Sequence, residues 1–125
     1  MLQEVPSRPS LSSSEGERTG VAAPPCRVLI VDDYPNMQQA LVSCVEPLEG
    51  YEVVGTASNG EQALELIASV HPDVIIADLQ MPVMDGFQML RLSRQRYPEV
   101  HLIAISGHFS PVIEKEAIAA GADVF

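Results

Sequence analysis

Apolar residues along the chain follow two different spacings. Three short runs are uninterrupted and rich in valine and isoleucine, at residues 28–31, 74–77 and 102–105. Runs of this length and composition predict strands that are covered on both faces of a sheet. A less apolar stretch at 52–57 predicts a strand at a sheet edge, and residues 122–125 predict the beginning of a fifth strand.

The segments between these runs have helical periodicity. A first helix is predicted near Pro35, closed by Pro47 and Gly50, with one apolar stripe facing inward. The residues of that stripe are Met37, Ala40, Leu41, Cys44, Val45 and Leu48.

Polar residues at the starts of three further segments predict helix N-caps. Asn59, with Gln62 three residues later, has the spacing of a capping box, and Asp85 with Gln88 repeats it. Ser110 precedes Pro111 at the start of the last predicted helix, which Gly121 ends. Strands that alternate with helices at this interval predict an α/β fold with a parallel sheet.

Carboxylates follow two of the predicted strands. Asp32 and Asp33 come directly after the first strand, Asp78 follows the third, and the hydroxyl of Ser106 follows the fourth. Ligands of open parallel sheets bind at the carboxyl ends of the strands. Two unit charges ~4 Å apart repel by about 4 kcal/mol at an effective dielectric constant near 20, so such a cluster favours a bound cation. Hard oxygen ligands at an open edge suit Mg²⁺.

A simpler interpretation exists for each aspartate alone, because an acidic residue after a strand is often only a helix cap. We assign that capping role to Asp85. Three acids and a hydroxyl on three strand ends favour a site for the set as a whole. Cys44 is predicted to lie in the core, and Cys26 in a linker.

Composition narrows the class of protein. The 125 residues include 17 acidic and 7 basic ones, a net charge of −10 with neutral histidines, which argues against direct binding to nucleic acid or to an anionic membrane. Residues 1–25 hold four prolines and five serines and predict a flexible N-terminal tail. No signal peptide or membrane-spanning run is evident, and two cysteines without metal-ligand spacing indicate a reducing compartment. We therefore expect one cytoplasmic domain over residues 26–125.

Four segments of that domain resemble the receiver domain of two-component response regulators. They are Val-Asp-Asp at 31–33, Asp-Leu-Gln-Met-Pro-Val-Met-Asp-Gly at 78–86, Ser-Gly at 106–107 and Ala-Gly-Ala-Asp at 120–123. The second segment is a highly specific motif, and the resemblance covers residues 26–125. It implies a flavodoxin-like, doubly wound parallel sheet of five strands in the order 2-1-3-4-5.

The resemblance also implies a role for each site residue. Asp78 is expected to accept a phosphoryl group from a sensor histidine kinase or a phosphotransfer protein, with Mg²⁺ as the cofactor. Asp33 is expected to bind the ion directly, Asp32 largely through water, and Gln80 through its backbone carbonyl. Ser106 corresponds to the switch hydroxyl and Phe125 to the switch aromatic residue. The family's chemistry is that of a signalling switch rather than of an enzyme with turnover.

The chain departs from the family at its C-terminal end. The family's lysine follows a few residues after the position of Phe125, and this chain ends first; Lys115 is expected on the surface instead. The end of the fifth strand and the last helix are also outside the chain, which would then be either a fragment or a natural product without an output face. With one helix fewer, parts of residues 28–31 and 102–105 are expected to be exposed.

Three functions remain open from the sequence. The first is the phosphoacceptor switch, which the acidic triad favours. The second is a degenerate receiver that binds partners independently of phosphorylation, which the absent lysine favours. The third, a hydrolase built on the acidic cluster, is weaker because no nucleophile–base pair stands out.

Overall fold

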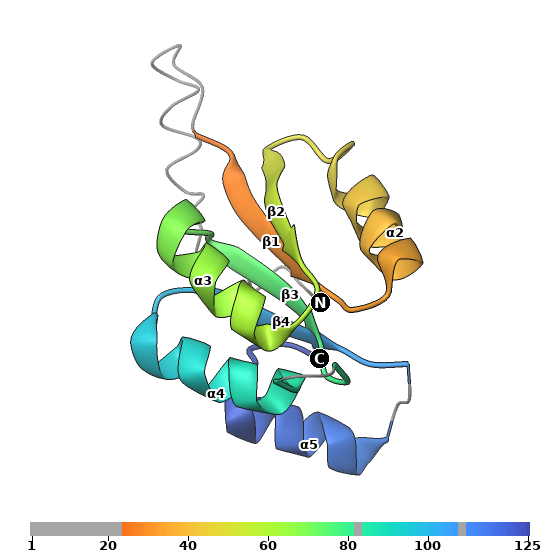
Figure 1. The fold of residues 1–125 in the computed structure, drawn as a ribbon, viewed down its shortest axis with the longest axis vertical. Helices are drawn as coiled ribbons and strands as arrows, with labels where there is room; N and C mark the ends of the chain where they lie inside the picture. Colours follow the sequence, from red (N-terminus) through yellow and green to blue (C-terminus); the bar gives the residue numbers. More distant parts are fainter. Residues whose placement is uncertain (1–23, 82–83, 108–109) are drawn as a thin grey trace.

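A parallel sheet of four strands forms the centre of the chain. A computed structural model describes residues 24–81, 84–107 and 110–125. The strands are β1 (Cys26–Val31), β2 (Tyr51–Ala57), β3 (Val74–Asp78) and β4 (His101–Ile105), and their order in the sheet is β2-β1-β3-β4 (Figure 1). Every neighbouring pair is parallel. The predicted α/β class and the order of the first four strands are confirmed.

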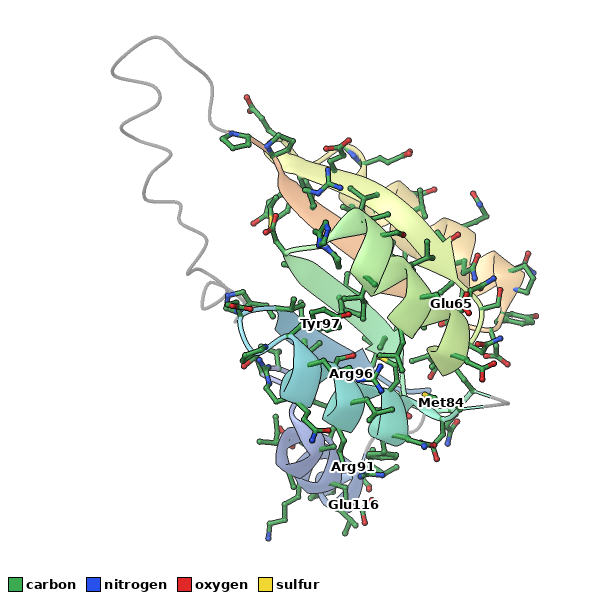
Figure 2. All side chains as sticks on the ribbon, turned by 60° about the vertical axis from the view of Figure 1, so that its left-hand side comes forward. Glu65, Met84, Arg91, Arg96, Tyr97 and Glu116 are labelled. Atoms are coloured by element: carbon green, nitrogen blue, oxygen red, sulfur yellow. The ribbon has the colours of Figure 1, made fainter. Side chains whose placement is uncertain are left out.

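Helices cover both faces of this sheet. They are α2 (Pro35–Val45), α3 (Gly60–Val70), α4 (Gly86–Arg96) and α5 (Pro111–Ala120). Packing against α2 occurs through Val28, Ile30 and Val74 on one face of the sheet. On the opposite face, side chains such as Leu29 and Leu102 pack with α3, α4 and α5. That helical layer turns charged side chains outward, among them Glu65, Arg91 and Glu116 (Figure 2).

The three predicted N-caps are confirmed. The side-chain oxygens of Asn59, Asp85 and Ser110 accept hydrogen bonds from backbone amides three residues later, at 2.8, 2.9 and 3.1 Å. The capping box at Asn59 is displaced by one residue, since the side chain of Gln62 accepts from the amide of Ser58 at 2.6 Å. Gly121 ends α5 as predicted, with φ at 127°.

The predicted inner face of α2 is confirmed for Leu41 and Val45 and wrong for the other four residues, which are exposed: Met37, Ala40, Cys44 and Leu48. The helix ends at Val45, its one buried residue, and the exposed fractions of Met37 and Leu48 are 43% and 51%. Cys44 is exposed as well, although we predicted it to be in the core. The apolar stripe is wide, and the part that meets the sheet, with Leu41, Val42 and Val45, lies about a quarter turn from the part centred on Met37 and Cys44.

Two further expectations differ from the structure. Cys26 is the first residue of β1 and is buried, rather than part of a linker. Val28 is only 3% exposed and Leu29, Ile30 and Val31 are fully buried, so the predicted exposure of the first strand is wrong, because α2 and the neighbouring strands cover it. Ile103 and Ile105 in β4 are half-buried.

The predicted fifth strand is represented, in the part of the chain that the structure describes, by one isolated bridge and a few backbone hydrogen bonds from residues 123–124 to β4. Val124 forms an isolated parallel bridge to Ile103, and its carbonyl oxygen accepts from the amide of Ala104 at 2.9 Å. The bridge lies beside β4, where the expected order 2-1-3-4-5 places the fifth strand.

Candidate functional site

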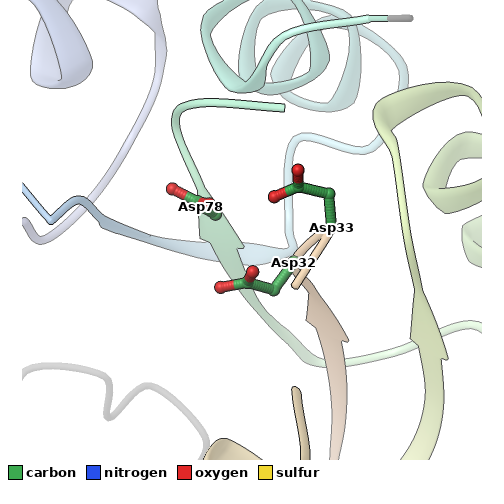
Figure 3. A group of neighbouring side chains, drawn as sticks. All are labelled: Asp32, Asp33 and Asp78. Atoms are coloured by element: carbon green, nitrogen blue, oxygen red, sulfur yellow. The ribbon is translucent and has the colours of Figure 1, made fainter. Parts of the chain in front are cut away.

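Three carboxylates meet at the carboxyl ends of β1 and β3. These strands are adjacent, and Val31 pairs with Ala77. The next residues, Asp32 directly after β1 and Asp78 at the last position of β3, therefore lie at the same level of the sheet. One carboxylate oxygen from each of Asp32, Asp33 and Asp78 lies within 4.8 Å of the others (Figure 3). Asp32 is buried, Asp78 half-buried and Asp33 exposed. The structure thus brings together the acidic triad that the sequence predicted.

Backbone amides fix two of these carboxylates. An oxygen of Asp32 accepts from the amide of Tyr34 at 2.9 Å, and an oxygen of Asp78 accepts from the amide of Gln80 at 3.1 Å. Each bond closes a short turn directly after a strand. The turns leave the remaining carboxylate oxygens available for a ligand at the sheet edge.

The electrostatics of the site disfavour three bare charges. Burial raises the pKa of Asp32, and the charge of Asp33 adds to that effect, while the hydrogen bond from Tyr34 opposes it. Burial also raises the pKa of Asp78, with further contributions from Asp32 and Asp33, and the amide of Gln80 opposes the shift. A cation at this place would relieve both the desolvation and the repulsion. Since all the donors are hard oxygens, the residues present fit a Mg²⁺ ion.

The other predicted site residues lie at or near the same edge of the sheet. Ser106 directly follows Ile105, which pairs with Asp78 across β3 and β4, and it is half-buried. Gln80 is exposed two residues after Asp78. Phe125, by contrast, is half-buried against the core on the side of α3, α4 and α5.

Two residues that shape the site were not singled out from the sequence. The backbone amide of Gly86 donates to the carbonyl of Leu79 at 3.0 Å, and a Cβ at Gly86 would overlap the carbonyl oxygen of Asp78. Gln38 in α2 donates its side-chain amide to the carbonyl of Asp32 at 2.7 Å. The glycine stands in the motif at 78–86 and could have been read from it, whereas nothing local marks Gln38.

Comparison with known proteins agrees with this fold and site. The sequence model of the response regulator receiver domain matches residues 28–125, and the chain belongs to that family. It is 39% identical over 113 residues to a protein-glutamate methylesterase/protein-glutamine glutaminase of Anaeromyxobacter dehalogenans, covering 90% of this chain and 28% of that protein. The chain spans less than half the length of the curated relatives it matches.

Two solved structures are similar over most of their length. The receiver domain of the putative response regulator NarL from Mycobacterium tuberculosis has a TM-score of 0.78 and 35% identity, over 82% of this chain and 83% of that one. The CheX–CheY–BeF3–Mg complex from Borrelia burgdorferi has a TM-score of 0.76 and 28% identity, over 90% and 84%. In the ranges that the structure describes, no helix is long and apolar enough to cross a bilayer.

Proposed function

We propose that this chain is a phosphoacceptor switch that receives a phosphoryl group on Asp78 from a sensor histidine kinase or a phosphotransfer protein. The observation that carries the proposal is the convergence of three carboxylates within 4.8 Å at the sheet edge, with Asp78 half-buried among them. A carboxylate oxygen of Asp78 attacks the phosphorus of a phosphohistidine. The new P–O bond forms as the P–N bond breaks, and the leaving imidazole keeps the electron pair and takes up a proton.

The proposed cofactor is Mg²⁺. Asp33 and Asp78 would bind it directly, Asp32 largely through water, and Gln80 through its backbone carbonyl. When bound, the ion supplies neutralising charge for phosphoryl transfer, which depends mostly on alignment and electrostatics. The name of the similar Borrelia CheY complex includes Mg and BeF3. That name supports the proposal that this chain also binds Mg²⁺.

Two residues are proposed to respond to the phosphoryl group. Its oxygens are strong acceptors, and the Ser106 hydroxyl is proposed to donate to one of them. The position of Ser106, one residue past the strand partner of Asp78, supports this role. Phe125 is proposed as the aromatic residue that changes its packing with this movement, since it is half-buried against the core on the side of α3, α4 and α5. Such a local change biases a two-state surface rather than turning over a substrate.

The proposed domain comprises residues 26–125, with residues 1–25 as a tail outside it. All but two residues of that tail, 24 and 25, lie outside the described residues. The proposed location is cytoplasmic, where ATP-dependent kinases form phosphohistidine donors.

Intact-mass spectrometry tests the function. The chain is incubated with acetyl phosphate and Mg²⁺, and the expected result is one added phosphoryl group on wild type and none on Asp78→Asn. Asp85→Asn is the matched control, because its side chain caps α4 in the same segment and an amide oxygen still accepts. Modification that persists in Asp78→Asn overturns the assignment. A wild type that is never modified favours the phosphorylation-independent interaction module.

A further inference from the structure

The side chain of Gln38 joins α2 to the ends of two strands. Its amide nitrogen lies 2.7 Å from the carbonyl oxygen of Asp32, 3.0 Å from that of Ala57 and 3.3 Å from the hydroxyl of Ser58. Asp32 directly follows β1, and Ala57 is the last residue of β2. One primary amide therefore connects a helix to both strand ends beside the acidic site.

The half of α2 next to the site has few other attachments. Within the helix, which the structure describes throughout, Val45 at the far end is the one buried residue. The N-cap residue, Tyr34, makes no side-chain capping bond. Leu41 and Val42, further along the helix, pack against the core. Before them, the first turn of α2 is attached by the bond from the Tyr34 amide to Asp32 and by Gln38.

The bond from Gln38 completes the fixation of Asp32. The amide of Asp32 donates to the Ala57 carbonyl at 3.0 Å, and its carboxylate accepts from Tyr34. The remaining backbone group, the Asp32 carbonyl, belongs to the peptide unit that leads into Asp33. Gln38 holds that carbonyl, so it sets the plane of the peptide from which the exposed carboxylate of Asp33 extends.

The same network reaches α3. Ser58, whose hydroxyl is one of the three acceptors, donates its backbone amide to the side chain of Gln62 at 2.6 Å. Gln62 in turn donates its own amide to Asn59 at the start of α3. The segment after β2 is thereby held from both sides, which keeps the Ala57 and Ser58 acceptors in place for Gln38.

We propose that Gln38 is a positioning residue for the metal-binding pair Asp32 and Asp33. The inference rests on the proposed function, in which these carboxylates hold Mg²⁺. A neutral donor suits this place, because it can satisfy two carbonyl oxygens without competing with the ion for the carboxylates. Hydrogen-bond partners that orient metal ligands typically contribute 10- to 100-fold in metal affinity.

The test measures Mg²⁺ affinity in the full chain by NMR titration of the backbone amides. Gln38→Met keeps the size of the side chain and removes the donor, and we expect a dissociation constant on the order of 10-fold weaker than that of wild type. The matched control is Gln39→Met, since Gln39 is an exposed neighbour on the same helix; its affinity should equal that of wild type.

A second variant separates positioning from charge and from simple unfolding. Gln38→Glu adds a negative charge near the site, which by itself would tighten Mg²⁺ binding, whereas loss of the donor would weaken it. Weaker binding in this variant, with a folded amide spectrum, supports the positioning role. Equal or tighter binding in Gln38→Glu, or an unchanged affinity in Gln38→Met, overturns it. Absence of Mg²⁺ binding in wild type would instead refute the proposed function.

Discussion

Asp32 and Asp78 work against the stability of the fold at neutral pH. Both are taken out of water beside other negative charges, and the pKa of each carboxyl is raised above its ordinary value for this reason. A group whose pKa is higher in the folded state binds more protons when folded, so stability falls as the pH rises through that range. The acidic cluster therefore lowers the stability of the metal-free fold at neutral pH, and the same negative charges attract a cation.

Asp78→Asn is expected to stabilise the chain at pH 7 in metal-free buffer. The amide oxygen can still accept from Gln80, while the half-buried charge is gone. The folded pKa lies above the unfolded value of about 3.9, so the advantage of the variant should be largest above the folded pKa and should vanish below about 3.9. Thermal melts across this pH range measure it. A variant that is less stable than wild type at pH 7 would contradict the electrostatic account, and added Mg²⁺ should narrow the gap.

Gly86→Ala is expected to destabilise the fold by about 2 kcal/mol, as overpacking of a tight backbone contact does. The added Cβ would overlap the Asp78 carbonyl oxygen and lie 2.5 Å from the Cα of Leu79. Gly107→Ala is the control, because no heavy atom lies within 4 Å of its added Cβ. Chemical denaturation measures both variants, and equal losses would show that the contact at Gly86 relaxes without cost.

Among the elements, the end of α4 is tied to β4 and α5 by one side chain. The Arg94 guanidinium donates to the carbonyls of Gly121, Pro98 and Val100 and to the carboxylate of Asp123, at 2.7 to 3.2 Å. The same Asp123 oxygen accepts from the amide of Leu102 at 2.9 Å. These contacts lie at the amino ends of the strands, opposite the acidic site, and they fix where α5 ends.

Arg94→Leu is expected to cost about 2 kcal/mol of stability, since it removes charge-assisted bonds and leaves half-buried carbonyls without their donor. Arg96 is an exposed arginine on the same helix (Figure 2), and Arg96→Leu is the control. It should change the free energy of unfolding by about 0.5 kcal/mol or less. Urea denaturation compares the two. Similar losses in both variants would mean that the Arg94 contacts contribute little.

At the scale of the whole molecule, apolar exposure is concentrated around α2. Of the six large hydrophobic residues that are exposed in the described part of the chain, four lie on this helix or its flanks: Tyr34, Met37, Leu48 and Tyr51. The net charge of −10 opposes contact between copies, and salt screens that repulsion. Large apolar side chains that are exposed in one region of a surface favour association where they adjoin.

We expect the 125-residue chain to self-associate and to bind hydrophobic dyes, more strongly as salt is added. The double variant Met37→Gln and Leu48→Gln should reduce both effects, whereas Val112→Gln on α5 should change them little, although Val112 is 63% exposed. Sedimentation and dye fluorescence measure the effects. If wild type is monomeric and binds no dye at high salt, the exposed apolar residues on and beside α2 do not mediate self-association.

The sequence by itself determined the features that depend on a few neighbouring residues. The apolar runs at 28–31, 74–77 and 102–105 became β1, β3 and β4 with one or two residues added. A continuous apolar run suits a strand whose two faces are both buried. The caps at Asn59, Asp85 and Ser110 formed because each oxygen reaches an amide three residues away. The acidic triad followed from parallel strands, whose carboxyl ends share one edge, together with the family's strand order, which makes β1 and β3 neighbours.

The tertiary structure alone decided which face of each element is covered and how the site is held. Periodicity showed that Met37, Leu41 and Cys44 share a broad apolar stripe. The way α2 packs on the sheet turns Leu41 toward the core and leaves Cys44 exposed. The burial of Asp32 beside an exposed Asp33, and the bond from Gln38 to Asp32, depend on the packing of α2 against two strand ends. Such contacts join residues up to 20 positions apart, from Gln38 to Ser58. No local pattern encodes them, because the register and tilt that create them arise only when the whole layer packs.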